Sequence, residues 1–141
     1  MELRECAESD VRDVYDLVCE LKESELDYRG FEAAFGDKIN DKTMRCILAA
    51  EGGKAIGFLS LNIDYQLHHA AKVATIEELV VNAEHRGRGV GGLLLESAVQ
   101  HAKDAKCDVI ELTSGIARER AHKFYIKNGF AKSSLKFVMG L

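Results

Sequence analysis

The stretch Arg86-Gly87-Arg88-Gly89-Val90-Gly91-Gly92 joins two segments with different apolar patterns. The apolar run from Ile76 to Val81 precedes it and predicts a buried strand. Apolar residues at helical spacing follow it, namely Leu93, Leu94, Ala98, Val99, Ala102 and Ala105. A glycine-rich turn between a strand and a helix directs several backbone N–H groups at one point, where the helix dipole adds partial positive charge. Together with the two arginines, this arrangement predicts a cradle for phosphate groups; a turn without a ligand is the alternative.

The composition predicts one folded domain that spans residues 1–141. The chain is 47% hydrophobic and 30% charged, which is typical of a globular protein. Its net charge of -4 argues against nucleic acid as a partner, because such binding depends on clustered positive charge. No apolar run approaches the roughly 20 residues of a membrane span, so we expect no membrane partner. The scattered cysteines Cys6, Cys19, Cys46 and Cys107 predict free thiols and a cytoplasmic location; disulfides or a zinc site are the alternatives.

The order of the predicted elements indicates an α/β (α+β) fold. Strands are expected at 1–6, 47–50, 55–63, about 71–81, 108–113 and about 130–139. Helices are expected from Val11 to Leu21, briefly near Phe31 and Phe35, after the glycine turn, and at about 118–128. Antiparallel strands come first and two strand–helix pairings follow. The prediction is therefore a mixed, mostly antiparallel twisted sheet with helices on both faces.

Two motifs indicate which phosphate-containing ligand the glycine-rich turn binds. The segment Gly87-x-Gly89-x-x-Gly92 spells a dinucleotide fingerprint, but it follows a meander, and too few residues remain for a second nucleotide-binding half. Instead, Arg86-x-x-Gly89-x-Gly91 after Glu78-Leu79-Val80-Val81 resembles the coenzyme A signature of the GNAT acetyltransferase superfamily. Downstream, Ala121-x-x-Phe124-Tyr125-x-x-x-Gly129-Phe130 is similar to the helix-to-strand segment of that family.

The resemblance implies that acetyl-CoA is the cofactor and names its contacts. Backbone N–H groups of Arg86, Gly87, Arg88, Gly89, Val90 and Gly91 would hold the pyrophosphate. The strand 78–81 would splay from its neighbour, so that Leu79, Val80 and Val81 contact the pantetheine arm and an amide polarises the thioester carbonyl. Arg118 and Tyr125 are further candidate contacts of the cofactor. The sequence departs from the family pattern at Ala83, where proline is frequent, and at Arg118, which replaces an asparagine near the cofactor.

An acid and a base are needed, because the attacking amine loses a proton and the leaving thiolate gains one. The resemblance places Tyr125 as the acid beside the cofactor sulfur; aromatic packing beside Phe124 is the alternative. Glu77 and Glu78 interrupt an apolar strand, and alternation would send them to opposite faces. Glu78 would share its face with Ile76 and Val80, so it is the candidate base. Its alternatives are a bulge that turns it outward and a structural ion pair.

A further resemblance concerns the acceptor. The segments Cys19-Glu20-Leu21-Lys22-x-x-Glu25-x-Asp27, Met44-Arg45, Leu67-His68-His69, Glu78–Val81, Arg118 and Ala121-His122-x-Phe124-Tyr125 resemble the aminoalkylphosphonate N-acetyltransferases. The resemblance implies a small primary amine that carries a phosphonate, and an association with a divalent metal ion. Arg45, Tyr65, His69 and Glu78 are the candidate substrate residues, with Arg118 as a further cation for the phosphonate. His68 and His69 are the candidate metal ligands; two solvated histidines are the alternative.

The sequence therefore predicts an acetyl-CoA-dependent N-acetyltransferase that works by direct attack of the amine. Other acceptors are an amino acid, a protein or peptide amine, or a polyamine attracted by Glu20, Glu23, Glu25 and Asp27. A non-catalytic acyl-CoA sensor is the alternative from another class. An exposed strand near the C-terminus is a candidate surface for a homodimer.

Overall fold

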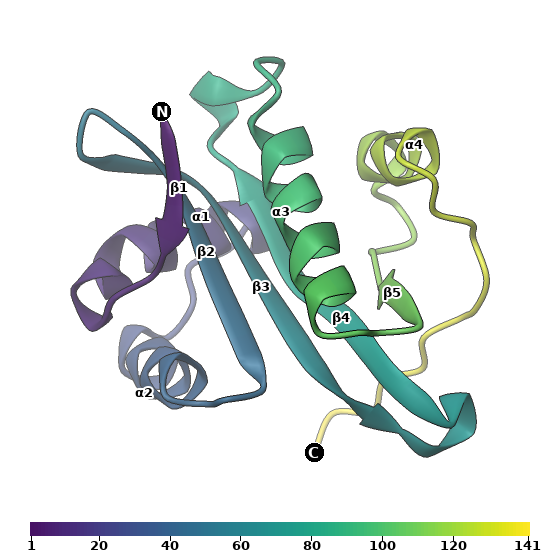
Figure 1. Ribbon diagram of the computed structural model, residues 1–141. Helices are drawn as coiled ribbons and strands as arrows, with labels where there is room; N and C mark the ends of the chain where they lie inside the picture. Colours follow the sequence, from purple (N-terminus) through teal and green to yellow (C-terminus); the bar gives the residue numbers. More distant parts are fainter.

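The computed structural model describes all residues from Met1 to Leu141 and centres on one five-stranded sheet (Figure 1). The strands follow the order β1-β2-β3-β4-β5 across the sheet, with antiparallel pairing up to β4 and parallel pairing between β4 and β5. They comprise β1 (Glu2–Glu5), β2 (Met44–Glu51), β3 (Lys54–Gln66), β4 (Ala71–Val81) and β5 (Val109–Leu112). The predicted mixed, mostly antiparallel sheet is thereby confirmed.

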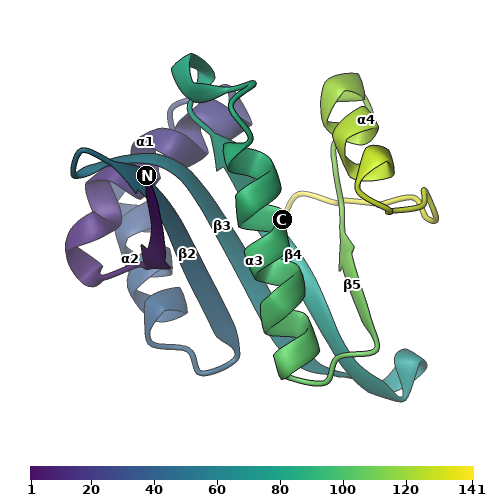
Figure 2. The ribbon, with the colours of Figure 1, turned by 45° about the horizontal axis from the view of Figure 1, so that its top comes forward.

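Helices cover both faces of the sheet, as predicted. Figure 2 shows α3 (Val90–Asp104) on one face, with α4 (Glu119–Lys127) beyond it, and α1 (Val11–Lys22) and α2 (Tyr28–Ile39) on the other. The second helix is a full 12 residues, longer than the sequence predicted. Its start is fixed by Asp27, whose carboxylate accepts a hydrogen bond from the Gly30 amide at 2.8 Å. None of the helices is long and apolar enough to cross a membrane.

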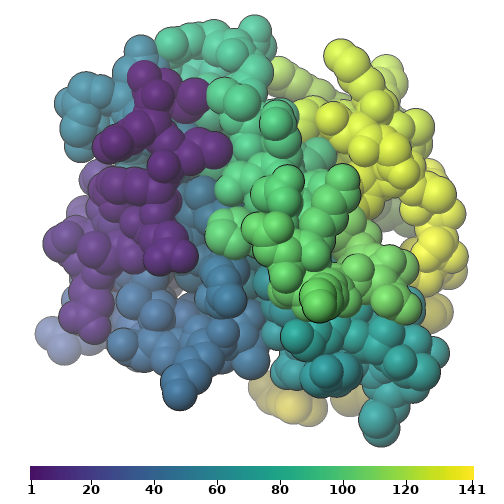
Figure 3. All heavy atoms as spheres, viewed as in Figure 1, coloured from purple at the N-terminus to yellow at the C-terminus, as the bar shows by residue number.

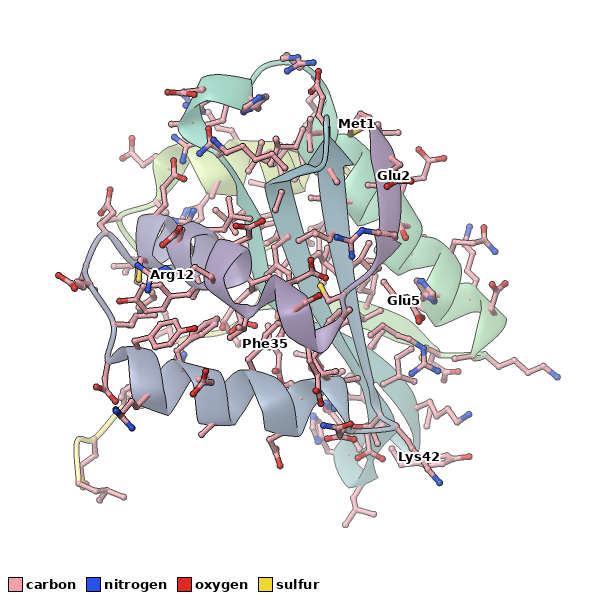
Figure 4. The ribbon with its side chains drawn as sticks, turned by 90° about the vertical axis from the view of Figure 1, so that its left-hand side faces the viewer. Met1, Glu2, Glu5, Arg12, Phe35 and Lys42 are labelled. Atoms are coloured by element: carbon pink, nitrogen blue, oxygen red, sulfur yellow. The ribbon has the colours of Figure 1, made fainter.

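Two hydrophobic cores lie on opposite faces of the sheet, because successive strand residues point to opposite sides. On β2, Ile47 and Ala49 belong to the core under α3, whereas Cys46 and Leu48 belong to the core under α1 and α2. Figure 4 shows α1 and α2 lying side by side over the sheet, with Phe35 labelled on α2. This burial on both faces explains the long apolar runs in β2 and β3.

A β-bulge interrupts the pairing of β3 with β4 at Glu77. Ser60 pairs with Glu78, but the next residue, Leu61, pairs with Ile76, so Glu77 is the extra residue. The bulge changes which residues share a face beyond it. Ile76 lies in the core under α3, whereas Val80 lies in the core under α1 and α2.

The predicted last strand at 130–139 is not formed. Residues 131–141 make no backbone hydrogen bond, and Figure 3 shows the C-terminal segment, in yellow, along the outer side of the molecule. Apolar side chains recur with a period of two, namely Leu135, Phe137, Met139 and Leu141, and they are exposed. Such a pattern suits a strand locally, but a strand also needs a neighbouring backbone, which this segment lacks.

Candidate active site

The phosphate cradle lies between the end of β4 and the start of α3. Gly87 and Gly89 have φ angles of +78° and +83°, which residues with a Cβ rarely adopt. The backbone N–H groups of residues 87–92 donate to no acceptor in the protein, and the first bonded amide of the helix is that of Leu93. The predicted donor set is corrected at Arg86, whose backbone N–H donates to the Ala83 carbonyl at 3.5 Å. This is a row of free donors at a helix N-terminus, the arrangement that binds phosphate.

Each arginine of the cradle contacts a carboxylate from another part of the chain. Arg88 donates to both carboxylate oxygens of Glu51, the last residue of β2, at 3.0 and 3.1 Å. This hydrogen bond, with the nearby positive charge, lowers the pKa of Glu51. Arg86 donates to the Val81 carbonyl at 3.2 Å and lies 3.6 Å from a Glu20 carboxylate oxygen.

Strands β4 and β5 separate beside the cradle. Their pairing ends at Ile76 and Leu112, whereas β4 continues to Val81 without a neighbour on that side. The N–H groups of Glu78 and Asn82 point toward β3, where they donate to a hydroxyl and a carbonyl at 3.0 and 2.8 Å. Because strand amides alternate in direction, those of Leu79 and Val81 face the open side. The structure therefore has the splayed strand that the family resemblance implies.

Helix α4 brings the second motif to this opening. A Cβ atom on Gly91 would lie 3.5 Å from the Phe124 ring and 3.6 Å from the Val81 side chain, so α3, α4 and the end of β4 meet there. Tyr125 follows Phe124 and packs edge-on against Phe124 and Phe130 at centroid distances of 5.5 and 5.8 Å. The two sequence motifs are thus neighbours in space.

Tyr125 is suited to hold a proton at neutral pH. Burial raises the pKa of its hydroxyl, and the positive charge of Arg118 opposes this shift. The guanidinium of Arg118 forms no ion pair in the protein. Near the end of β5, the hydroxyl of Ser114 is buried without a hydrogen-bond partner. Such an orphaned polar atom calls for an explanation, and a bound group is one.

Glu78 lies at the start of the unpaired section of β4, on the face covered by α1 and α2. The Ser60 hydroxyl donates to its carboxylate and accepts from its backbone N–H at 3.0 Å. Burial raises the pKa of Glu78; the Ser60 hydrogen bond opposes this, Glu77 adds to it, and Lys38 opposes it. Lys38 itself lies 3.5 Å from Glu77. Glu78 is thus a partly buried carboxylate with a defined orientation.

The expected placement of the two glutamates was wrong in one respect. Strict alternation put Glu77 and Glu78 on opposite faces, with Glu78 beside Ile76. The bulge instead separates Glu78 from Ile76 and leaves it on the face of Val80. The sequence left open a bulge that turns Glu78 outward; the bulge is present, but it leaves Glu78 partly buried on the α1–α2 side.

The other predicted substrate residues do not lie beside Glu78. Arg45 is on the α3 face of β2 by alternation, and its guanidinium donates to the Lys42 and Met44 carbonyls, each at 3.0 Å. Tyr65 lies five pairs along the ladder from Ser60, and His69 lies in the turn beyond it, roughly 20 Å from Glu78 at the rise of a strand.

The two histidines do not form a metal site with a third ligand. Their rings are 4.5 Å apart, and His69 lies 3.4 Å from the Glu111 carboxylate, yet the protein contains no group of three metal-ligating side chains. A bound divalent ion usually takes three or more protein ligands, or several waters in place of some of them. These residues do not fit the predicted ion, and no step is assigned to it.

Sequence reasoning missed the contacts that four side chains make around the site, namely those of Lys38, Ser60, Glu20 and Glu51. Ser60 offered a signal, because it is the one polar residue in the apolar run from Ala55 to Leu61. The two glutamates offered none, since their partners are 37 or more residues away.

Comparison with known proteins agrees with this geometry. The model of the acetyltransferase (GNAT) family matches residues 11–130, which include both motifs. The chain belongs to the GNAT acetyltransferase family. It is therefore an N-acetyltransferase, and the acetyl donor of its family is acetyl-CoA.

Individual relatives cover almost the whole chain. The aminoalkylphosphonate N-acetyltransferase of Salmonella typhimurium is 37% identical over 140 residues, which are 99% of this chain and 91% of that protein. A putative acetyltransferase from Agrobacterium tumefaciens is 27% identical, with complete coverage of both chains and a TM-score of 0.88. A Bacillus halodurans protein described as a transcriptional regulator has a TM-score of 0.89 at 26% identity and covers 99% of both chains.

Substitution of Gly89 in the cradle by alanine is expected to weaken the binding of coenzyme A. Gly89→Ala strains the backbone at a φ of +83°, so the free amides turn away and the Kd for coenzyme A rises on the order of tenfold. Gly92→Ala is the matched control, because it adds a Cβ inside α3 that contacts nothing. Calorimetric titration measures both constants; equal affinities for the two variants contradict the assignment of the cradle.

Proposed function

We propose that this acetyltransferase transfers an acetyl group from acetyl-CoA to the primary amine of a small aminoalkylphosphonate. Its main support is the 37% identity to an aminoalkylphosphonate N-acetyltransferase over 99% of the chain. Glu78 and Tyr125 flank the unpaired section of β4 in accord with this function, one at its start and one beside its end.

The residues at the cradle would bind the donor. The free N–H groups of residues 87–92 hold the diphosphate, and Arg86 and Arg88 add charge. The outward amides of Leu79 and Val81 hold the pantetheine arm, with one of them directed at the thioester carbonyl oxygen. When bound, acetyl-CoA supplies the acetyl group as a thioester. The chain thus orients the donor mainly through its backbone.

Two side chains would move the protons. The carboxylate of Glu78 takes a proton from the amine, directly or through water, while the amine nitrogen bonds to the acetyl carbon and the C–S bond breaks. The hydroxyl of Tyr125 gives its proton to the departing sulfur. The pKa values of both groups are raised, which suits these roles. A raised pKa strengthens Glu78 as a base and keeps Tyr125 protonated at neutral pH.

Arg118 is the cation that we assign to the phosphonate. Its guanidinium has no carboxylate partner, and it is close enough to Tyr125 to affect the pKa of that hydroxyl. Arginine matches a phosphonate well, because its parallel N–H donors bind two oxygens at once. The acidic stretch is less available to a polyamine than its sequence suggests, because Glu20 contacts the cradle and Asp27 caps α2.

A panel of amines tests the acceptor. With acetyl-CoA and thiol release as the readout, kcat/KM is expected to be highest for 2-aminoethylphosphonate and on the order of tenfold lower for spermidine, glycine and a short peptide. Arg118→Gln removes that preference, because the phosphonate loses its cation, while the rate with a neutral alkylamine changes little. A preference of the wild-type protein for spermidine or the peptide overturns the proposed acceptor.

Removal of each proton carrier has a distinct signature. Glu78→Gln lowers kcat/KM on the order of a hundredfold, because the amine loses its base. In the wild-type protein, kcat/KM falls as pH drops through the raised pKa of Glu78, since only the carboxylate accepts a proton. Tyr125→Phe lowers kcat by a similar factor and leaves the Kd for coenzyme A nearly unchanged.

A pH profile of both rates, with unfolding measured in parallel, separates these roles from structural effects. A carboxyl group whose pKa is raised by folding stabilises the fold below its unfolded pKa, and this contribution is lost as pH rises through the folded pKa. The free energy of unfolding of the wild-type protein, measured relative to that of Glu78→Gln, should therefore decline as pH rises through the pKa of Glu78. Full activity of either variant across all pH values removes that residue from the mechanism.

We also infer a homodimer in which a second copy pairs with the free edge of β5. That edge has no neighbour in the sheet, and the same chain carries an unpaired segment, residues 131–141, with strand-like apolar alternation. Two copies can exchange these segments symmetrically, each satisfying the backbone groups of the other.

Light scattering after size-exclusion chromatography tests the assembly. The wild-type protein is expected to elute as a dimer at micromolar concentration, and Phe137→Lys as a monomer, because a charge replaces an apolar contact that is 89% exposed in the single chain. Lys136→Gln, one residue away on the other side of the segment, should remain dimeric. A monomeric wild-type protein refutes this assembly.

A further inference from the structure

Glu20 joins two parts of the chain that are far apart in sequence. It lies in the last turn of α1, and one of its carboxylate oxygens accepts a hydrogen bond from the Ala83 backbone N–H at 2.7 Å. The same oxygen lies 3.6 Å from the Arg86 guanidinium, and the other accepts from the Asn82 side-chain amide at 3.5 Å. One side chain, itself 28% exposed, thus contacts three of the residues that lead into the cradle.

Apart from the hydrogen bond from the Asn82 N–H to the Ile56 carbonyl at 2.8 Å, the segment that Glu20 contacts has few other contacts to hold it. It forms the short turn Ala83–His85, which buries no side chain. Its other bonds are mostly internal, such as those from His85 and Glu84 back to Asn82 at 2.9 and 3.0 Å. The chain contains no proline, so no ring stiffens the segment. Its position therefore depends on contacts from outside.

We propose that Glu20 is a positioning residue for the acetyl-CoA cradle. It fixes the segment ahead of the free amides and holds the guanidinium of Arg86 beside them. Arginine has five N–H donors, so Arg86 can keep Glu20 and the Val81 carbonyl as partners and still donate to a diphosphate oxygen. This proposal rests on acetyl-CoA binding at the cradle, as proposed above.

The charge of Glu20 alone would act in the opposite direction. A carboxylate near the cradle repels a diphosphate, so a purely electrostatic role predicts tighter binding once Glu20 is neutralised. A positioning role predicts weaker binding, because the segment loses its anchor. The sign of the change in cofactor affinity therefore distinguishes the two.

Glu51 provides a matched control. It also pairs with a cradle arginine, with its contacts to Arg88 at 3.0 and 3.1 Å, and its side chain is 40% exposed. Unlike Glu20, it accepts no hydrogen bond from the backbone of the segment. Glu51→Gln thus removes a carboxylate and frees an arginine while the backbone contacts stay in place.

The decisive experiment compares three variants in the full-length protein. Glu20→Ala should raise the Kd for coenzyme A and the KM for acetyl-CoA on the order of tenfold, with the KM for the amine unchanged. Glu20→Gln keeps one acceptor oxygen for the Ala83 amide, so it should restore part of this loss, to about threefold. Glu51→Gln should bind coenzyme A at least as tightly as the wild-type protein.

The outcomes are distinguishable. If Glu20→Ala and Glu20→Gln bind coenzyme A as well as the wild-type protein or better, the positioning role is refuted, whatever happens to the melting temperature. A lower melting temperature with an unchanged KM for acetyl-CoA identifies a merely structural contact and also refutes it. If the wild-type protein itself does not bind coenzyme A, the cofactor site has failed rather than the role of Glu20.

Discussion

The pairing between β4 and β5 is the constraint on which the site depends. It ends at Ile76 and Leu112, although β4 continues to Val81. Strand amides that face a missing neighbour must find another acceptor or remain unsatisfied. The open stretch of β4 can therefore receive an extended polar ligand as if it were a strand. The cradle at the end of β4 and the docking of α4 through Phe124 and Gly91 frame the same opening.

The bulge at Glu77 changes the face of the sheet on which the following side chains of β4 lie. Before the bulge, the even-numbered residues Ala74 and Ile76 fill the core under α3. Beyond it, the even-numbered residue Val80 lies in the core under α1 and α2. Glu78 is the first residue after this change, and Ser60 satisfies the backbone N–H that the bulge leaves without a ladder carbonyl. One irregularity thus explains which way the carboxylate of Glu78 points and why its backbone N–H bonds to a hydroxyl.

The sequence predicted the sheet and the cofactor loop well, because both rest on local patterns. Apolar runs located the central strands, and the glycines after Val81 located the cradle. The sequence left a bulge near Glu78 open as one alternative but could not decide for it, because the pattern of one strand does not show how that strand pairs with its neighbour. The strand expected at 130–139 failed for a related reason: alternation shows that a segment can pair, but not that a neighbour is present. Contacts such as that of Glu20 with Ala83 join residues 63 positions apart and have no local signal.

The free donors of residues 87–92 belong to the main chain, and this has an evolutionary consequence. Every amino acid except proline carries the same N–H group, so most side-chain changes in the loop leave the number of donors intact. Selection should therefore act on backbone shape, through residues such as Gly87 and Gly89, more strictly than on the identity of the residues between them. Binding through the main chain also explains why this loop matches a dinucleotide fingerprint. Unrelated folds that bind a diphosphate through backbone N–H groups need the same glycine spacing.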